Sequence, residues 1–253
     1  MALNTWHDFP FSDSWLADDL SSTPVSSWSN GQSGEALTQA TGSRQPAYSA
    51  TSGPNSQPGV TFDGDDDFME AAIGTKAQPQ SYVFVFRYIS SSDFHWLFDS
   101  SDEGNNGRQL FGRGSSGVWQ IHAGSSITSG SVDTDFYAGI AYFDGSSSTL
   151  ELDNTTIVSG NTGTQSQSQG IVVGTRFLKT DFFSNIVVSA IGVYNGDART
   201  DTEWQNLVNY TNWKWGLNLG VADEEPSGPT RKWYNGTSFE DKPLKVYNGT
   251  EWV

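Results

Sequence analysis

Four aspartates within five residues mark the most acidic point of the chain. They are Asp63, Asp65, Asp66 and Asp67. Carboxylates at this density repel one another unless they are solvated or bind a cation, and Ca²⁺ prefers several carboxylate and carbonyl oxygens on flexible loops. The segment therefore predicts a calcium site, with a solvated turn as the alternative.

A second acidic segment, residues 99–107, is another candidate for calcium. Its potential ligands are Asp99, Asp102 and Glu103. The spacing partly matches an EF-hand loop, but Leu110 stands at the twelfth position, where a bidentate glutamate would complete the coordination sphere. An exposed hairpin connection is the other interpretation of this segment.

Aromatic and planar polar side chains on neighbouring predicted strands could form a sugar-binding face. They are Trp96, Arg113, Trp119 and His122. Sugars stack their C–H groups on flat aromatic rings and hydrogen-bond to planar polar groups around them. Tryptophan carries a large apolar surface and often belongs to the core, so burial of these side chains is the alternative.

The sequence offers little for catalysis. A glycosidase needs two carboxylates about 5–10 Å apart, and Glu151 and Asp153 are the obvious pair, because residues two apart share one face of a strand. The three histidines lack metallohydrolase spacing, and no Gly-x-Ser-x-Gly motif occurs. We therefore expect no enzymatic activity and assign no catalytic residue.

Short apolar runs separated by turn-forming residues predict an all-β chain. The 27 glycines and the many Ser, Asn and Asp residues supply positive φ angles and local hydrogen bonds for tight turns. Residues 82–89 alternate Tyr or Phe with Val, so both faces of that strand are apolar and it belongs in the middle of a sandwich. Further strands are expected over residues 136–143, 149–158, 171–174 and 186–194.

One helix is expected near the end of the main domain. Thr200 and Glu203 have the spacing of a capping box, and apolar side chains recur at helical spacing over residues 204–211. Gly216 follows where a C-terminal cap would lie. We expect this helix to close an open end or side of the sandwich.

Residues 1–12 are predicted to form an N-terminal arm. They lack the basic start and long apolar run of a signal peptide, and Trp6, Phe9 and Phe11 would dock the arm on a neighbouring surface. An unstructured terminus is the alternative. No run of 18 apolar residues occurs anywhere, so we expect no membrane insertion. Cysteine is absent, which excludes disulfides.

The chain is strongly acidic, with a formal net charge of −16. Nucleic-acid-binding surfaces are basic, so nucleic acid is excluded as a partner. The acid excess suits a salt-rich medium that screens self-repulsion, which makes a halophilic source one interpretation and an ordinary acidic surface the other.

A linker over residues 220–230 is predicted to follow a main domain that spans residues 13–219. Its sequence, GVADEEPSGPT, combines Pro, Gly and acids without apolar periodicity. Residues 231–253 then repeat with a 13-residue period, as KWYNGTSF and KVYNGTEW. Asn-Gly in each copy suits the type I′ turn of a β-hairpin. Two such hairpins bury little alone, so we expect an assembly or attachment element, with a decorative β-unit as the alternative.

Four segments resemble, in order, the laminin-G-like and concanavalin-A-like lectin and glucanase fold. They are residues 13–31, 44–48, 59–69 and 204–217, which contain Trp-Ser-Asn-Gly, Phe-Asp-Gly-Asp-Asp and Lys-Trp-Gly. The resemblance implies a two-sheet antiparallel jelly-roll sandwich with one C-terminal helix, to which the chain adds a small C-terminal β-hairpin repeat. Enzymes of this fold usually carry Glu-x-Asp-x-x-Glu, and here Thr156 replaces the third carboxylate.

The C-terminal repeat is also similar to short repeats in phage and archaeal virus structural proteins. Because a fold alone does not determine function, we combine this likeness with the missing catalytic residues. We expect a non-enzymatic, homo-oligomeric virion surface or tail-associated protein that contacts other virion proteins and binds a host-surface glycan or glycoprotein. The alternatives are a purely structural capsid decoration protein and a secreted carbohydrate-binding module or glycosidase.

Overall fold

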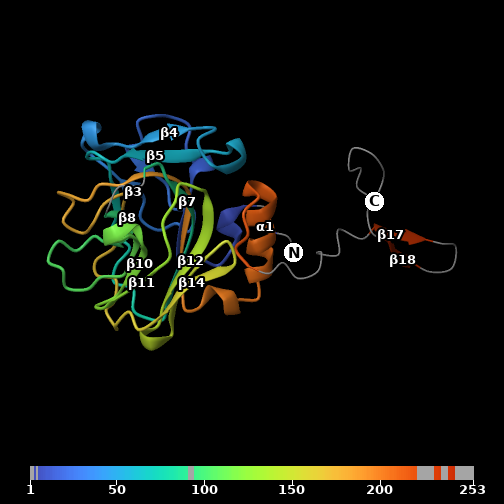
Figure 1. The fold of residues 1–253 in the computed structure, drawn as a ribbon. Coiled ribbons are helices and arrows are strands. Elements are labelled where there is room, and N and C mark those ends of the chain that lie inside the picture. Colours follow the sequence, from blue (N-terminus) through green and yellow to red (C-terminus); the bar gives the residue numbers. More distant parts are fainter. Residues whose placement is uncertain (1–2, 4, 91–93, 221–230, 235–238, 243–253) are drawn as a thin grey trace. The chain divides into compact units, whose positions relative to one another are not determined.

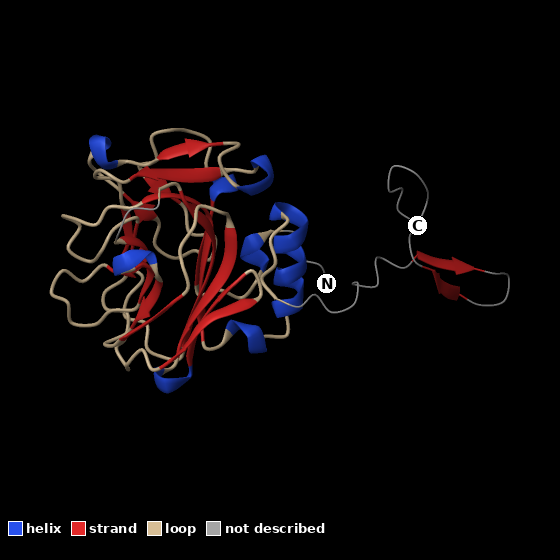
Figure 2. Ribbon diagram, in the orientation of Figure 1, coloured by secondary structure: helices blue, strands red, loops and turns tan. Residues whose placement is uncertain are grey.

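The computed structural model describes residues 3, 5–90, 94–220, 231–234 and 239–242. Residues up to Gly220 form one unit, and residues 221–253 form a second. The first unit consists of two antiparallel sheets of eight strands each and, among the described residues, one α-helix (Figures 1 and 2). The predicted all-β sandwich is confirmed, and its architecture is consistent with a jelly-roll.

Sheet A has the order β14-β13-β12-β7-β16-β5-β4, and β1 pairs with the later part of β16. Strands β7 and β16 lie side by side in its centre, where burial on both faces matches their nearly continuous apolar sequences. The strands are β1 (Asp13–Leu16), β4 (Ala47–Ser49), β5 (Gly59–Asp63), β7 (Gln80–Tyr88), β12 (Tyr137–Phe143), β13 (Ser148–Leu152), β14 (Thr155–Gly160) and β16 (Asn185–Asn195).

Sheet B has the order β11-β10-β9-β8-β15-β6-β3-β2. Its strands are shorter than the central strands of sheet A, and its outer part carries the loops that build the site described below. The strands are β2 (Ser27–Trp28), β3 (Leu37–Thr38), β6 (Met69–Ala71), β8 (His95–Ser100), β9 (Leu110–Arg113), β10 (Trp119–His122), β11 (Ser126–Ser129) and β15 (Ile171–Val173).

An aromatic core fills the space between the two sheets. Phe84 of β7 stacks on Phe111 of β9 with ring centroids 4.6 Å apart, and Tyr82 stacks on Phe98 of β8 at 4.3 Å. Val83 and Val85 alternate with these rings and belong to a second core on the opposite face of sheet A. The prediction that this strand is apolar on both faces and lies centrally is therefore confirmed.

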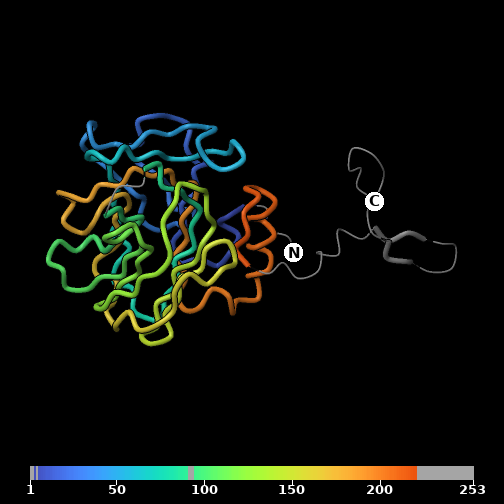
Figure 3. The backbone as a smooth tube through the Cα atoms, viewed as in Figure 1, coloured from blue at the N-terminus to red at the C-terminus, as the bar shows by residue number. Residues whose placement is uncertain are grey.

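The second core lies between sheet A and a layer formed by helix α1 (Trp204–Trp215) and the N-terminal residues. Trp6 and Phe9 are fully buried in it, and Trp6 meets Trp215 edge-on at 5.7 Å. Figure 3 shows the blue N-terminal segment beside the orange helix. The expected arm thus packs on its own domain. The helix covers the outer face of sheet A, so of the two predicted places, an open end or a side of the sandwich, it occupies the side.

Seven short 3₁₀ helices occur among the described residues: η1 (Trp6–Asp8), η2 (Ala17–Asp19), η3 (Gly42–Arg44), η4 (Pro54–Ser56), η5 (Ser115–Gly117), η6 (Gly145–Ser147) and η7 (Ala198–Thr200). In this described part of the chain, no helix combines the length and apolarity of a membrane span.

The predicted strand over residues 149–158 was wrong, because the chain reverses within it. Asp153 and Asn154 have φ angles of 45° and 61° and connect β13 to β14 as an antiparallel hairpin. Positive φ at both central residues is the requirement of a type I′ turn, and Asp and Asn tolerate it better than most residues do. Apolar residues lie on both sides of the turn, Leu150 and Leu152 before it and Ile157 and Val158 after it, which is why one continuous strand was predicted.

The predicted capping box was also wrong, although the helix itself is present. Thr200 ends η7, and Glu203 is the residue before the helix but makes no side-chain capping bond. The Asp201 carboxylate instead accepts a hydrogen bond from the Glu203 backbone amide at 2.8 Å. At the other end Gly216 adopts a left-handed conformation with φ of 69°, so the predicted C-terminal cap is confirmed.

The second unit contains an antiparallel hairpin of β17 (Arg231–Tyr234) and β18 (Phe239–Lys242). The first copy of the predicted repeat begins within β17, at Lys232, and ends at the first residue of β18, Phe239. The predicted Asn-Gly turn and the whole second copy, residues 245–252, lie outside the described residues.

Candidate functional site

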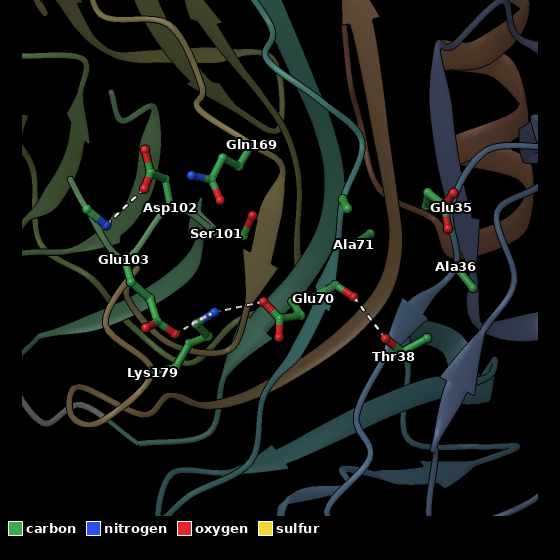
Figure 4. Close-up of a pocket in the computed structure, with 12 residues that line it drawn as sticks. Glu35, Ala36, Thr38, Glu70, Ala71, Ser101, Asp102, Glu103, Gln169 and Lys179 are labelled. Carbon is green, nitrogen blue, oxygen red and sulfur yellow. Dashed lines mark hydrogen bonds and ion pairs between the residues drawn. The ribbon is translucent and has the colours of Figure 1, made fainter. Parts of the chain in front are cut away.

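A pocket of about 640 Å³ opens on sheet B where β6 and β8 end and β15 begins (Figure 4). A volume of this size lies in the range of about 300–1,000 Å³ typical of ligand pockets. Charged and amide side chains line much of its wall: Glu35, Glu70, Asp102, Glu103, Gln169 and Lys179. The hydroxyl groups of Thr38 and Ser101 add to this polar lining.

The strand register explains why distant segments meet at this pocket. Ile171 at the start of β15 pairs with Ala71 at the end of β6 and with Ser100 at the end of β8. Antiparallel pairing therefore gathers the loop after β8, the residues after β6 and Gln169, two residues before β15, at one edge. Glu70 lies between core residues Met69 and Ala71, so strand alternation directs it away from the core.

Lys179 connects two walls of the pocket. It lies in the loop between β15 and β16, and its Nζ contacts a carboxylate oxygen of Glu70 at 2.8 Å and of Glu103 at 2.9 Å. Burial lowers the pKa of Lys179, but the hydrogen bonds with both carboxylates outweigh it and leave the pKa raised. The ammonium group therefore stays charged and ties β6 to the loop after β8.

Asp102 holds the loop after β8 in shape. Its carboxylate accepts hydrogen bonds from Ser168 Oγ at 2.8 Å, from the Gly104 amide at 2.9 Å and from Asn106 Nδ2 at 3.0 Å. The Ser168 bond is the main reason that its pKa is lowered. Asp102 is thus an ionised acceptor on the pocket wall.

Asp99 does not line the pocket and is completely buried. Its carboxylate forms a bidentate pair with Arg108 and accepts hydrogen bonds from the backbone amides of Ser100 and Phe177, at 2.7 and 3.2 Å. Burial raises the pKa of this carboxyl group although Arg108 opposes the shift. Of the three calcium ligands predicted in this segment, only Asp102 and Glu103 reach the pocket, because Asp99 is turned toward Arg108.

The other predicted calcium segment forms a tight turn after β5. Ligand oxygens of Asp63, Asp66 and Asp67 lie within 4.8 Å of one another, and Asp65 is not part of this group. Asp63 accepts the Asp65 amide at 2.8 Å, while Asp67 accepts the Asp63 amide at 3.0 Å. Burial, with a contribution from the neighbouring carboxylates, raises the pKa of Asp67 to about 6. Three clustered carboxylates suit the ligand preference of Ca²⁺, and calcium binding stays a prediction.

The four residues predicted to bind sugar lie on β8, β9 and β10 but do not form one face. Trp119 is part of the core, where it stacks on Phe111 at 5.8 Å, and Arg113 is its cross-strand partner. Trp96 pairs with Gly112 and His122 with Leu110, in the alternate positions that face away from the core. Sequence spacing alone did not show that Trp119 and Arg113 lie on the core-facing side of the sheet.

The carboxylates considered for catalysis do not act as a pair. Glu151 forms an ion pair with Arg199, whose guanidinium also binds Asp197 at 2.8 Å. Asp153 lies in the β13–β14 turn and accepts a hydrogen bond from the Ala138 amide at 3.0 Å. The turn separates the two residues, so they do not share a strand face as predicted.

Four charged or amide residues of the pocket were not predicted from the sequence: Glu35, Glu70, Gln169 and Lys179. Glu70 carries a detectable signal, since a charged residue between Met69 and Ala71 marks the solvent face of a strand. Lys179 and Gln169 lie in loops without any motif, and only the folded chain brings them near the others.

The sequence matches no family model and no curated protein, but solved structures share its fold. Domain 4 of AbnA, a GH43 extracellular arabinanase from Geobacillus stearothermophilus solved with arabinotriose, is 10% identical with a TM-score of 0.57, covering 74% of this chain and 92% of that domain. Trypanosoma rangeli sialidase in complex with sialic acid is 13% identical with a TM-score of 0.52, covering 77% of this chain. A complex of that enzyme with difluorosialic acid is 12% identical with a TM-score of 0.57, covering 81% of this chain. This chain spans about a third of the sialidase, at 31% and 33% of its length.

Proposed function

We propose that the protein is a non-enzymatic glycan-binding module and that the pocket on sheet B is its binding site. The pocket itself carries the proposal, because it combines a volume suited to a small ligand with a dense set of hydrogen-bonding side chains. The likeness to a domain solved with arabinotriose gives additional support at the level of the fold.

The chemistry of the lining suits hydroxyl groups. Ionised carboxylates accept two or more hydrogen bonds each, and the Gln169 amide both donates and accepts. Sugar hydroxyls can supply donors to Glu35, Glu70 and Glu103 and accept from Lys179, so a saccharide would replace the water lost on binding. Charge-assisted hydrogen bonds of this kind are stronger than those between neutral groups.

The same side chains argue against glycosidase activity. A general acid in such an enzyme is a carboxyl group whose pKa is raised so that it stays protonated. In the pocket, the pKa of Asp102 is lowered, and Glu70 and Glu103 both bind the ammonium group of Lys179. These groups are arranged to hold a ligand rather than to exchange protons with it.

Filling the pocket tests the proposal. Ala72 is exposed and lines the pocket, so Ala72→Trp would occupy the space of a ligand. Ala47 is exposed on β4 of sheet A, and Ala47→Trp is the matched control. The labelled wild type and the control should bind members of a neutral and acidic glycan array, whereas Ala72→Trp should lose at least about tenfold in affinity. Absence of binding by the wild type to every glycan would refute the proposed function.

The biological setting is proposed from the sequence. The C-terminal repeat resembles repeats of viral structural proteins. On this basis we propose that the protein lies on a virion or other extracellular surface, self-associates and attaches to a host glycoprotein. Negative-stain microscopy and light scattering of the full chain would measure the oligomeric state, and a purely monomeric protein would contradict self-association.

A further inference from the structure

We infer that the sheet B pocket selects uncharged saccharides and excludes sugars that carry a carboxylate or sulfate group. This inference rests on the proposed glycan-binding function and adds the chemical class of the ligand. It follows from the balance of charge in the pocket and from the way in which the single lysine is used.

The pocket lining contains four carboxylates and one ammonium group. The acids are Glu35, Glu70, Asp102 and Glu103, and Lys179 is the base. An anionic ligand would therefore enter a region of like charge, where repulsion acts at short distance and is only partly screened by salt. Discrimination by like-charge contact is a common way to reject a wrong partner.

The lysine is not free to compensate a ligand anion. Its Nζ already contacts Glu70 at 2.8 Å and Glu103 at 2.9 Å, and only 13% of its side chain is exposed. A ligand carboxylate could accept a hydrogen bond from the third donor of the ammonium group, but it would then lie beside two glutamates that already balance this charge. Figure 4 shows Lys179 lying between these two side chains.

A neutral sugar meets none of these penalties. Its hydroxyl groups are donors as well as acceptors, and the pocket presents carboxylate oxygens in excess. Sialic acid, the ligand in one of the structures of similar fold, carries a carboxylate. The charges of this pocket therefore predict a specificity different from the one that the likeness of fold would suggest.

The test compares glycans that differ only in charge. An array would carry galacturonic acid oligomers and sialyllactose, each beside its neutral carboxyl methyl ester, and would be probed with the labelled full chain at low and high salt. We expect the neutral member of at least one pair to bind about tenfold more tightly or better, with the difference shrinking as salt rises.

Two charge-reversal variants assign the selectivity to the pocket. Glu103→Lys changes a side chain that is 65% exposed, so folding should be preserved. Asp135→Lys makes the same change of net charge at an exposed residue that does not line the pocket. Glu103→Lys should narrow the difference between neutral and acidic glycans several-fold, and Asp135→Lys should leave it unchanged.

The outcomes separate this inference from the function on which it rests. Equal or tighter binding of the acidic members, or equal responses of the two variants, would overturn the inference and leave glycan binding intact. Failure of the wild type to bind any glycan would remove the proposed function and the inference with it.

Discussion

Replacing Arg108 with leucine should strongly destabilise the domain. Asp99 is completely buried, and Arg108 is the cation that balances its charge, with only 17% of the arginine side chain exposed. Arg108→Leu leaves the carboxylate with two backbone donors, Ser100 and Phe177. Breaking a buried ion pair from one side typically costs about 3–5 kcal/mol. For a domain of this size that corresponds to a fall in Tm of roughly 6–20 °C, at about 2–4 °C per kcal/mol.

The double variant Asp99→Asn/Arg108→Leu identifies the cause. If the cost comes from an uncompensated buried charge, removing that charge should restore part of the stability, so the double variant should unfold at a higher urea concentration than Arg108→Leu alone. Equal stability of the single and double variants would refute the reasoning. Circular dichroism during urea unfolding of the wild type and both variants at pH 7 provides the measurement.

The pH dependence gives a second check with a defined sign. Burial already raises the pKa of Asp99, and loss of Arg108 removes the main opposing interaction. The folded variant therefore holds a proton on Asp99 more tightly than the unfolded chain does. Stability lost in Arg108→Leu should return as the pH falls toward the ordinary pKa of Asp and should decline as the pH rises.

Three further predictions follow from other parts of the fold. Trp6→Ala should lower the free energy of unfolding by about 3–5 kcal/mol because Trp6 is fully buried. Trp213→Ala, at a 76% exposed position, should change it by less than about 0.5 kcal/mol. Similar urea midpoints for the two variants would contradict the packing described for the N-terminal residues. The pKa of Asp67 is raised from 3.8 to about 6, so the wild type should lose stability relative to Asp67→Asn as the pH rises from about 4 through 6. A difference in the free energy of unfolding that stayed constant between pH 4 and 8 would contradict this raised pKa. If the predicted calcium site after β5 exists, millimolar calcium should raise the Tm of the wild type and not of Asp67→Asn, and an unchanged wild-type Tm would count against the site.

The sequence predicted the features that depend on local pattern. The two-faced apolar strand β7 and the cap at Gly216 were identified because alternation and glycine conformation are encoded within a few residues. The β13–β14 turn was missed although Asp153 and Asn154 are turn-forming residues, because apolar residues on both sides of them were interpreted as one strand. Apolar composition alone does not reveal where a strand reverses.

The site was less predictable because its residues come from separate segments. Asp102 and Glu103 were selected as calcium ligands for their composition, yet what surrounds them depends on Glu70 and Lys179, which are distant in sequence. Trp119 was considered for a binding face, but its register with Arg113 turns it into the core. Strand pairings between remote segments determine both the composition of the pocket and the burial of Trp119. A single sequence does not directly show which remote segments pair.

The contact between Trp6 and Trp215 has a consequence for how the chain is made. These residues come from the first and last elements of the domain, so one face of sheet A stays uncovered until the final helix has been synthesised. Contacts between such remote positions form late, and they slow the folding of the domain. A nascent chain that stops before residue 204 would expose Val83, Val85 and Ile140 to solvent. Stepwise truncation from either end should therefore destabilise the domain, whereas circular permutation that joins those ends should be tolerated.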